Sequence, residues 1–93
     1  GGSITAQTDD EILYAYRLLG KHEGIFVEPA SAASIAGILK ASANGEIAKG
    51  SNIVATVTGH GLKDPASATE GIEIPEPVEP NLDEVMKIID TLI

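Results

Sequence analysis

The sequence contains no cysteine, no tryptophan, one phenylalanine and two tyrosines among its 93 residues. Without cysteine the chain forms neither a disulfide nor a thiolate metal site, and a cytoplasmic location is expected. Its two histidines, His22 and His60, lie far apart in the sequence and have no metal-ligand neighbours, so no metal site is predicted. The few aromatic residues and the many alanines, isoleucines and glycines favour close packing of helices on a sheet.

Basic residues and long apolar runs are also scarce. Six Lys and Arg stand against 14 Asp and Glu, which gives a net charge of −8, and residues 64–93 carry eight of the acids with a single base. Phosphate backbones and anionic lipid repel such a chain, so nucleic acid and membrane surfaces are excluded as partners. No apolar stretch approaches the roughly 18 residues of a membrane span, and no basic region precedes an apolar segment, so neither a transmembrane helix nor a signal peptide is expected.

Two segments in the first half of the chain have the pattern of helices. Residues 8–22 begin with Thr8 three positions before Glu11, which is a capping box, and continue with an apolar stripe. Residues 29–44 begin with a proline, continue as "ASAASIAGILKASA" and end before Gly45, which suits a left-handed C-cap. One face of this second helix carries only alanine and glycine, so we expect it to press closely against a sheet or a bound ligand.

The last third of the chain has a different composition. Prolines alternate with acidic residues over 66–80, which predicts an extended connector, because proline cannot donate regular backbone hydrogen bonds. Asn81, followed by Glu84 three positions later, then predicts the cap of an amphipathic C-terminal helix over residues 81–93.

Two short segments have the pattern of strands. Residues 25–27 are rich in β-forming side chains, and residues 52–58, "NIVATVT", are apolar without alternation, as in a parallel strand covered on both faces. Such a strand needs neighbours that this chain does not supply. We therefore expect an α/β fold: a partial three-layer domain in which helices pack on a short parallel sheet. Residues 1–93 then form part of one larger domain, either by assembling with other copies as a homo-oligomer or as the C-terminal piece of a longer protein.

The loop "TGHGLKDP" after the second predicted strand is the first candidate site. Thr58 ends that strand, and ligands of open α/β sheets bind outside the carboxyl ends of the strands. The alternative is an ordinary β-branched strand end. Gly59 and Gly61 are explained by turn chemistry as well as by a ligand. His60 and Lys63 have two interpretations, a base with an anion partner or two solvent-facing residues.

The segment "EPASAAS" is the second candidate site. Glu28 lies between a strand and a helix start, and Ser31 and Ser34 occupy the first helical turns, where backbone N–H groups can hold an anion. The alternative is a capping serine with a carboxylate satisfied by backbone amides. His22, near the end of the first helix, is interpreted as a surface residue that favours the helix dipole.

Together, "GIFVEPASAASIAGILK", "VATVTGHGLKDP", the acidic connector and the terminal helix resemble the C-terminal portion of threonine synthase, a pyridoxal-phosphate enzyme of fold type II. The resemblance covers essentially the whole chain. It implies a lyase that converts O-phospho-L-homoserine and water to L-threonine and phosphate, with pyridoxal 5'-phosphate as cofactor. The chain is then an incomplete portion of the large cofactor-binding domain. A fragment of a related serine or threonine dehydratase, and a non-enzymatic binding or assembly module, remain as alternatives.

The resemblance also assigns roles to residues. It places the hydroxyl of Thr58 against the pyridine nitrogen of the cofactor, and Gly59 and Glu28 beside the cofactor. A neutral hydroxyl can donate to an unprotonated ring nitrogen. The lysine that forms the Schiff base and the glycine-rich phosphate loop are expected upstream of this chain, and Lys63 lies in the wrong motif to be that lysine. The 93 residues alone are therefore expected to be inactive.

Overall fold

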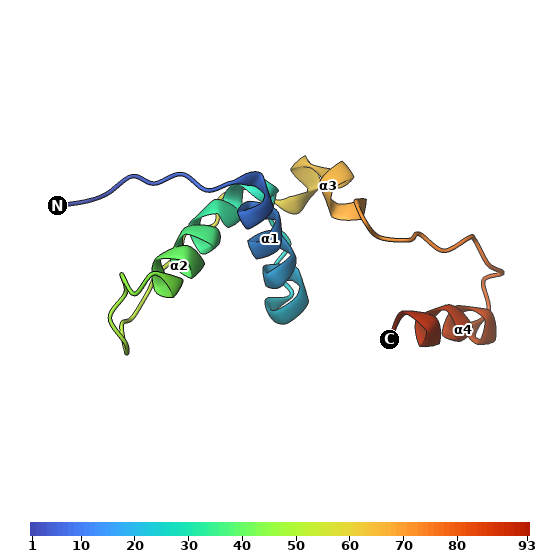
Figure 1. The fold of residues 1–93 in the computed structure, drawn as a ribbon. Helices are drawn as coiled ribbons and strands as arrows, with labels where there is room; N and C mark the ends of the chain where they lie inside the picture. The colour runs from blue at the N-terminus through green and yellow to red at the C-terminus, as the bar shows by residue number, and fades with distance from the viewer.

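The computed structural model describes residues 1–93 as a mainly helical chain with an extended outline (Figure 1). Helices cross in the N-terminal half, short helical segments follow, and a last helix stands apart at the C-terminal end. The elements are α1 (Asp9–Glu23), η1 (Pro29–Ala32), α2 (Ala33–Ala43), η2 (Gly61–Lys63), α3 (Pro65–Thr69) and α4 (Leu82–Leu92), where η denotes a 3₁₀ helix.

The start of α1 is the predicted capping box. Thr8 Oγ1 accepts a hydrogen bond from the backbone N–H of Glu11 at 3.2 Å, and the Glu11 carboxylate accepts one from the N–H of Thr8 at 2.8 Å. Glu11 also pairs with Lys40 of α2, with 3.2 Å between Nζ and Oε1. The helix ends at Gly24, whose φ of 64° lies in the left-handed region where glycine carries no steric penalty. Local sequence signals therefore set both ends of α1.

We expect α1 to lose part of its stability in acid through Glu11. The hydrogen bond from the Thr8 backbone, and then that from Lys40, lower the pKa of the Glu11 carboxyl below its ordinary value of 4.5. A lowered folded-state pKa gives stability that is complete above the ordinary value and is lost as the pH falls through the lowered one. An NMR titration of this carboxyl, with helix content followed in parallel, measures the effect. An unchanged acid profile in Glu11→Gln would contradict it.

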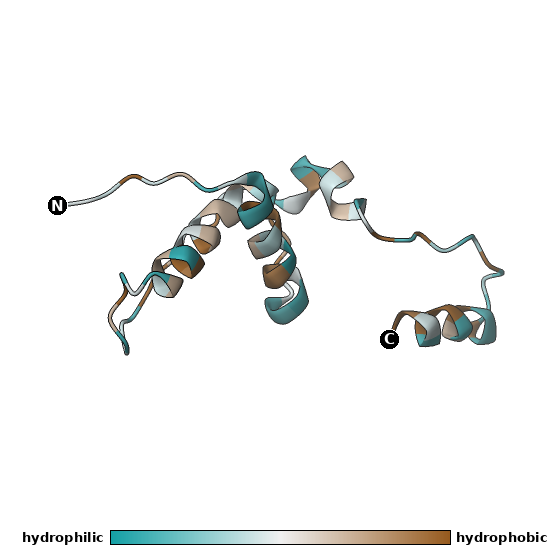
Figure 2. Cartoon of the chain, viewed as in Figure 1, coloured by the Kyte–Doolittle hydropathy of each residue, from teal (hydrophilic) through white to brown (hydrophobic).

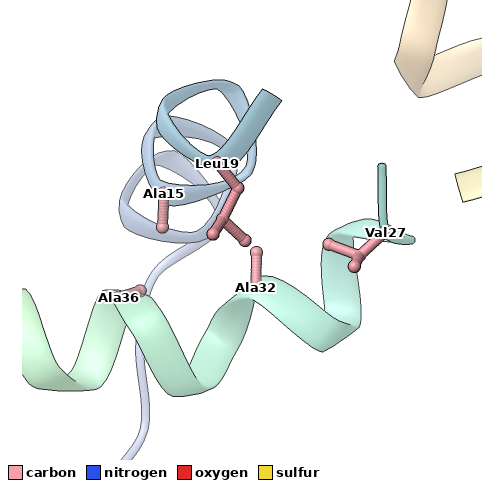
Figure 3. Packing of buried hydrophobic residues seen from close by; sticks show 5 residues of the cluster. All are labelled: Ala15, Leu19, Val27, Ala32 and Ala36. Carbon is pink, nitrogen blue, oxygen red and sulfur yellow. The ribbon is translucent and has the colours of Figure 1, made fainter. Parts of the chain in front are cut away.

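The core lies between α1 and the start of α2 and is made of small side chains (Figure 3). Ala15 and Leu19 project from α1. They meet Ala32 at the end of η1 and Ala36 in α2, and Val27 completes the cluster. Ala15 and Ala32 are fully buried, so a methyl group fills each contact and the two backbones come close. The alanine-rich face that was predicted to press on a sheet or a ligand packs on a helix instead.

The sheet part of the predicted α/β fold is not confirmed, because the chain contains no strand. Residues 52–58 run without regular structure, and Ile53 and Val54 in this segment are 49% and 93% exposed. The predicted strand over 25–27 is reduced to one isolated antiparallel bridge between Val27 and His60. A strand becomes regular only when a neighbour fills its ladder, and none of the remaining segments of the chain runs alongside residues 52–58 as a strand.

The predicted connector begins later than expected. Residues 66–69 belong to α3, which Asp64 caps by accepting a hydrogen bond from the Ser67 N–H at 3.1 Å, so this part of the range is helical and not extended. The C-terminal helix is confirmed as α4, with Asn81 accepting from the Glu84 N–H at 3.0 Å. Hydrophobic and hydrophilic residues alternate in patches around α4 (Figure 2), and none of its side chains is buried.

The chain is much less compact than a closed domain of its size. The Cα radius of gyration is 17.2 Å, whereas a compact domain of this length has a radius of about 12 Å. The accessible surface is 7354 Å², against roughly 5,100 Å² for a compact monomer of this mass. Much apolar surface therefore faces solvent, although none of the helices has both the length and the hydrophobicity that a membrane crossing needs.

Candidate functional site

The two segments singled out in the sequence meet at the hydroxyl of Ser31. This side chain is 4% exposed, and its Oγ accepts hydrogen bonds from the backbone N–H groups of Gly59 at 2.5 Å and Thr58 at 3.2 Å. The Oγ atom also lies 3.0 Å from Thr58 Oγ1 and 3.3 Å from the Gly59 carbonyl oxygen. One buried hydroxyl thus joins η1 to the beginning of the "TGHGLKDP" loop.

Short backbone contacts hold these segments in register. The N–H of Glu28 donates to the Gly59 carbonyl at 3.0 Å, and the N–H of Gly61 donates to the Phe26 carbonyl at 3.2 Å. The tight turn at Pro29 then directs Ser31 back toward the loop, because proline fixes the φ angle that starts a helical turn. Ser34, one turn further on, donates to the Thr56 carbonyl at 3.0 Å. The contacts of Phe26, Glu28 and Ser31 therefore fix the position of Thr58, whereas Ser34 holds the backbone two residues before it.

Side chains from the same chain approach two glycines of the loop closely. A Cβ atom at Gly59 would overlap the Glu28 carboxylate, and one at Gly61 would overlap the Phe26 ring. The half-buried Glu28 side chain lies against the Gly59 backbone and makes no capping bond to η1. Glu28 and Gly59 are therefore neighbours, as their joint prediction as site residues requires.

Of the titratable residues of the loop, His60 and Asp64 form hydrogen bonds within the chain, and Lys63 forms no ion pair. His60 Nδ1 accepts from the Leu62 N–H at 3.1 Å, and its ring meets Phe26 edge to face with centroids 5.5 Å apart. Lys63 is exposed and forms no ion pair. The hydrogen bond from the Ser67 hydroxyl, and then that from its backbone N–H, lower the pKa of Asp64, the cap of α3. These contacts make His60 and Asp64 parts of turns.

Other features of the surface lie away from Thr58. A hollow of about 440 Å³ lies between α1 and α3 and is lined by residues that include Tyr16, Phe26 and Ile72. Neither Thr58 nor Ser31 lines it. No group of three or more histidine, aspartate or glutamate side chains is placed to hold a metal ion, and His22 belongs to the last turn of α1. Thr58, exposed at the end of residues 52–58, remains the position where a ligand can meet a hydroxyl held by buried partners.

Comparison with known proteins assigns the chain to a family. Residues 1–59 match the family model described as "Pyridoxal-phosphate dependent enzyme". The chain belongs to the pyridoxal-phosphate dependent enzymes. Pyridoxal phosphate is accordingly the cofactor of this family member, and the resemblance found in the sequence is confirmed.

Curated relatives of this pyridoxal-phosphate dependent enzyme are threonine synthases. The chain is 55% identical over 80 residues to the threonine synthase of Halalkalibacterium halodurans, 56% over 81 residues to that of Mycobacterium tuberculosis, and 47% over 92 residues to that of Methanocaldococcus jannaschii. These matches cover 86%, 85% and 99% of the chain, but 23%, 22% and 23% of the relatives. The chain therefore spans about a quarter of their length.

The donor set at Thr58 fits one edge of the cofactor. Thr58 offers an exposed neutral hydroxyl on a backbone that is held by Ser31, which suits a pyridine nitrogen. The loop carries a single cation, Lys63, and the sequence contains no glycine-rich phosphate loop. The sequence predicted Ser31 only as an anion holder or a cap. The signal for its actual partners, a serine two residues after a proline, is too common to have identified them.

Proposed function

We propose that the chain is a C-terminal segment of a cytoplasmic threonine synthase, a lyase that converts O-phospho-L-homoserine and water to L-threonine and phosphate. The observation that carries the proposal is the meeting of the "EPASAAS" and "TGHGLKDP" segments at the Ser31 and Thr58 hydroxyls, in a member of a pyridoxal-phosphate dependent family. The names of the relatives favour this reaction over that of a serine or threonine dehydratase.

In this proposal the residues of the chain bind and orient the cofactor without reacting. Thr58 donates its hydroxyl hydrogen to the pyridine nitrogen, and the backbone at Gly59, with Glu28 against it, forms part of the wall beside the ring. Pyridoxal phosphate, when bound, supplies an electron sink for bonds at the substrate carbons. A neutral hydroxyl leaves the ring nitrogen uncharged, whereas a carboxylate at the same place would favour its protonation. Thr58 thereby tunes how strongly the ring withdraws electrons.

The rest of the site belongs, in this proposal, to a longer protein. The lysine that binds the cofactor covalently and the loop that holds its phosphate are assigned to residues upstream of Gly1. Two observations support the assignment: the chain spans 23% of its relatives, and apolar side chains of residues 52–58 lie exposed where a sheet would cover them. Residues 1–93 then form part of the large cofactor-binding domain, and other copies of the enzyme are its expected partners in a homo-oligomer.

We expect the full-length enzyme that carries this segment to release one phosphate for each L-threonine formed from O-phospho-L-homoserine. We expect the 93 residues alone to release none, because they lack the lysine and the phosphate loop. A colorimetric phosphate assay with amino-acid analysis of the products measures both. L-serine and L-threonine serve as control substrates. Release of ammonia from them, without phosphate release from O-phospho-L-homoserine, would replace the proposal by a dehydratase.

A further inference from the structure

The hydroxyl of Ser31 has four hydrogen-bond partners within reach but a single hydrogen, and this decides which of its hydrogen bonds it donates and which it accepts. A serine hydroxyl offers one hydrogen and two acceptor positions. The backbone N–H groups of Gly59 and Thr58 can only donate, and both point at Ser31 Oγ, at 2.5 Å and 3.2 Å. The two acceptor positions of Ser31 are therefore filled by backbone groups, and its single hydrogen must serve an acceptor.

Two acceptors lie within reach of that hydrogen. Thr58 Oγ1 is 3.0 Å from Ser31 Oγ, and the Gly59 carbonyl oxygen is 3.3 Å away. The Gly59 carbonyl already accepts a hydrogen bond from the N–H of Glu28 at 3.0 Å. Thr58 Oγ1 is the closer of the two acceptors, and it receives no hydrogen bond from another donor. Ser31 therefore donates to Thr58 Oγ1.

The direction of this bond decides what Thr58 can do. Ser31 has no acceptor position left for the hydroxyl hydrogen of Thr58, and that hydroxyl forms no hydrogen bond with any other group of the chain. The hydrogen therefore turns outward, on the exposed side of the residue. A hydroxyl that already accepts one hydrogen bond is polarised into a better donor, and it has one acceptor position fewer for an incoming N–H.

We infer that Ser31 is a positioning residue that sets Thr58 as a donor toward the pyridine nitrogen of pyridoxal phosphate and keeps that nitrogen unprotonated. The inference rests on the proposed function, in which Thr58 faces this nitrogen. Ser31 itself does not touch the cofactor: it is buried beneath the loop, and its effect passes through the Thr58 hydroxyl. Ser34 is the matched comparison, because it comes from the same helical end and bonds the same segment at the Thr56 carbonyl, yet forms no hydrogen bond with Thr58.

The test compares pyridoxal phosphate with its analogue in which a CH group replaces the ring nitrogen, both bound to the full-length enzyme. The ratio of the two dissociation constants isolates the bond to the nitrogen from general damage to the loop. We expect Ser31→Ala to weaken pyridoxal phosphate relative to the analogue by roughly 2- to 12-fold, the range of one neutral hydrogen bond. Ser34→Ala should leave the ratio unchanged. The ¹⁵N resonance of a labelled ring nitrogen should move toward that of a free pyridine in Ser31→Ala.

Thr58→Val separates this inference from the proposed function. If Thr58→Val leaves the ratio unchanged, the assignment of Thr58 to the pyridine nitrogen fails, and the role of Ser31 fails with it. If Thr58→Val changes the ratio and Ser31→Ala does not, only the positioning role is overturned. Should Ser31→Ala not fold, Ser31→Cys offers a side chain of the same shape, slightly larger, with a weaker donor. If the ratio of dissociation constants for Ser31→Cys lies between that of the unmodified enzyme and that of Thr58→Val, the inference is supported. If the ratio equals that of the unmodified enzyme, the inference is overturned.

Discussion

Replacing Thr58 by valine in the full-length enzyme is expected to lower turnover and cofactor affinity together, by roughly 5- to 150-fold. The substitution keeps the shape of the side chain and removes the hydroxyl, which leaves the pyridine nitrogen without its donor at a cost of about 1–3 kcal/mol. Steady-state kinetics, a cofactor titration and the absorption band of the bound cofactor measure the three consequences. The loop should keep its place, because Ser31 can turn its hydrogen to the Gly59 carbonyl 3.3 Å away.

Thr58→Ser is the control for this substitution. Serine keeps the hydroxyl, so the kinetic parameters and the absorption band should stay close to those of the unmodified enzyme. Unchanged turnover and spectrum in Thr58→Val would remove the cofactor role of this residue. A loss in Thr58→Ser as large as that in Thr58→Val would point to the β-branched shape rather than to the hydroxyl as the property that matters.

Enlarging Ala32 to leucine should destabilise the protein and damage the site at the same time. Ala32 is fully buried against α1 beside Leu19, and it directly follows Ser31 on η1. Three further carbon atoms at this contact force the helices apart at a cost of about 1–3 kcal/mol or more, and they displace the turn that carries Ser31. Thermal unfolding of the full-length enzyme measures the first effect, and the cofactor dissociation constant measures the second.

Ala30 provides the matched control for the enlarged core residue. It lies on the same 3₁₀ turn but is exposed, so Ala30→Leu adds the same atoms without meeting α1. We expect its melting temperature and cofactor affinity to stay near those of the unmodified enzyme. Equal losses in both variants would show that the turn tolerates no larger side chain at all, and would contradict the role assigned to the packing of Ala32.

The helix ends were predictable because their signals are local. The pairs Thr8 with Glu11 and Asn81 with Glu84 lie three residues apart, and each forms its capping contact. Asp64 followed by Pro65 also carried the signal for α3, but the three prolines further along led to an extended prediction for the whole connector. Signals within one helical turn therefore predicted the structure correctly. The error at residues 66–69 arose because the proline-rich composition of the connector was taken to include a short helix capped by Asp64.

The strands and the site depend on contacts between distant residues. The apolar pattern of residues 52–58 indicates a strand that other elements cover on both faces. The chain contains no second strand to pair with it, so the predicted sheet does not form. The alanine-rich face of α2 was predicted to pack closely, yet the partner of Ala32 and Ala36 is α1 rather than a sheet. Thr58 was identified as a candidate from its place after an apolar run, whereas its contact with Ser31 joins residues 27 positions apart. Periodicity alone does not show which residues such long-range contacts bring together.

The segment between α3 and α4 has a mechanical consequence. The residues from Glu70 to Asn81 contain no helix, and prolines at three positions stiffen them without shortening them. A segment of this length reaches at most roughly 40 Å when fully extended. It acts as a tether that lets α4 turn about its point of attachment while limiting how far it can travel. The first turn of α4, and the surface that covers it, therefore lie within about that distance of Thr69.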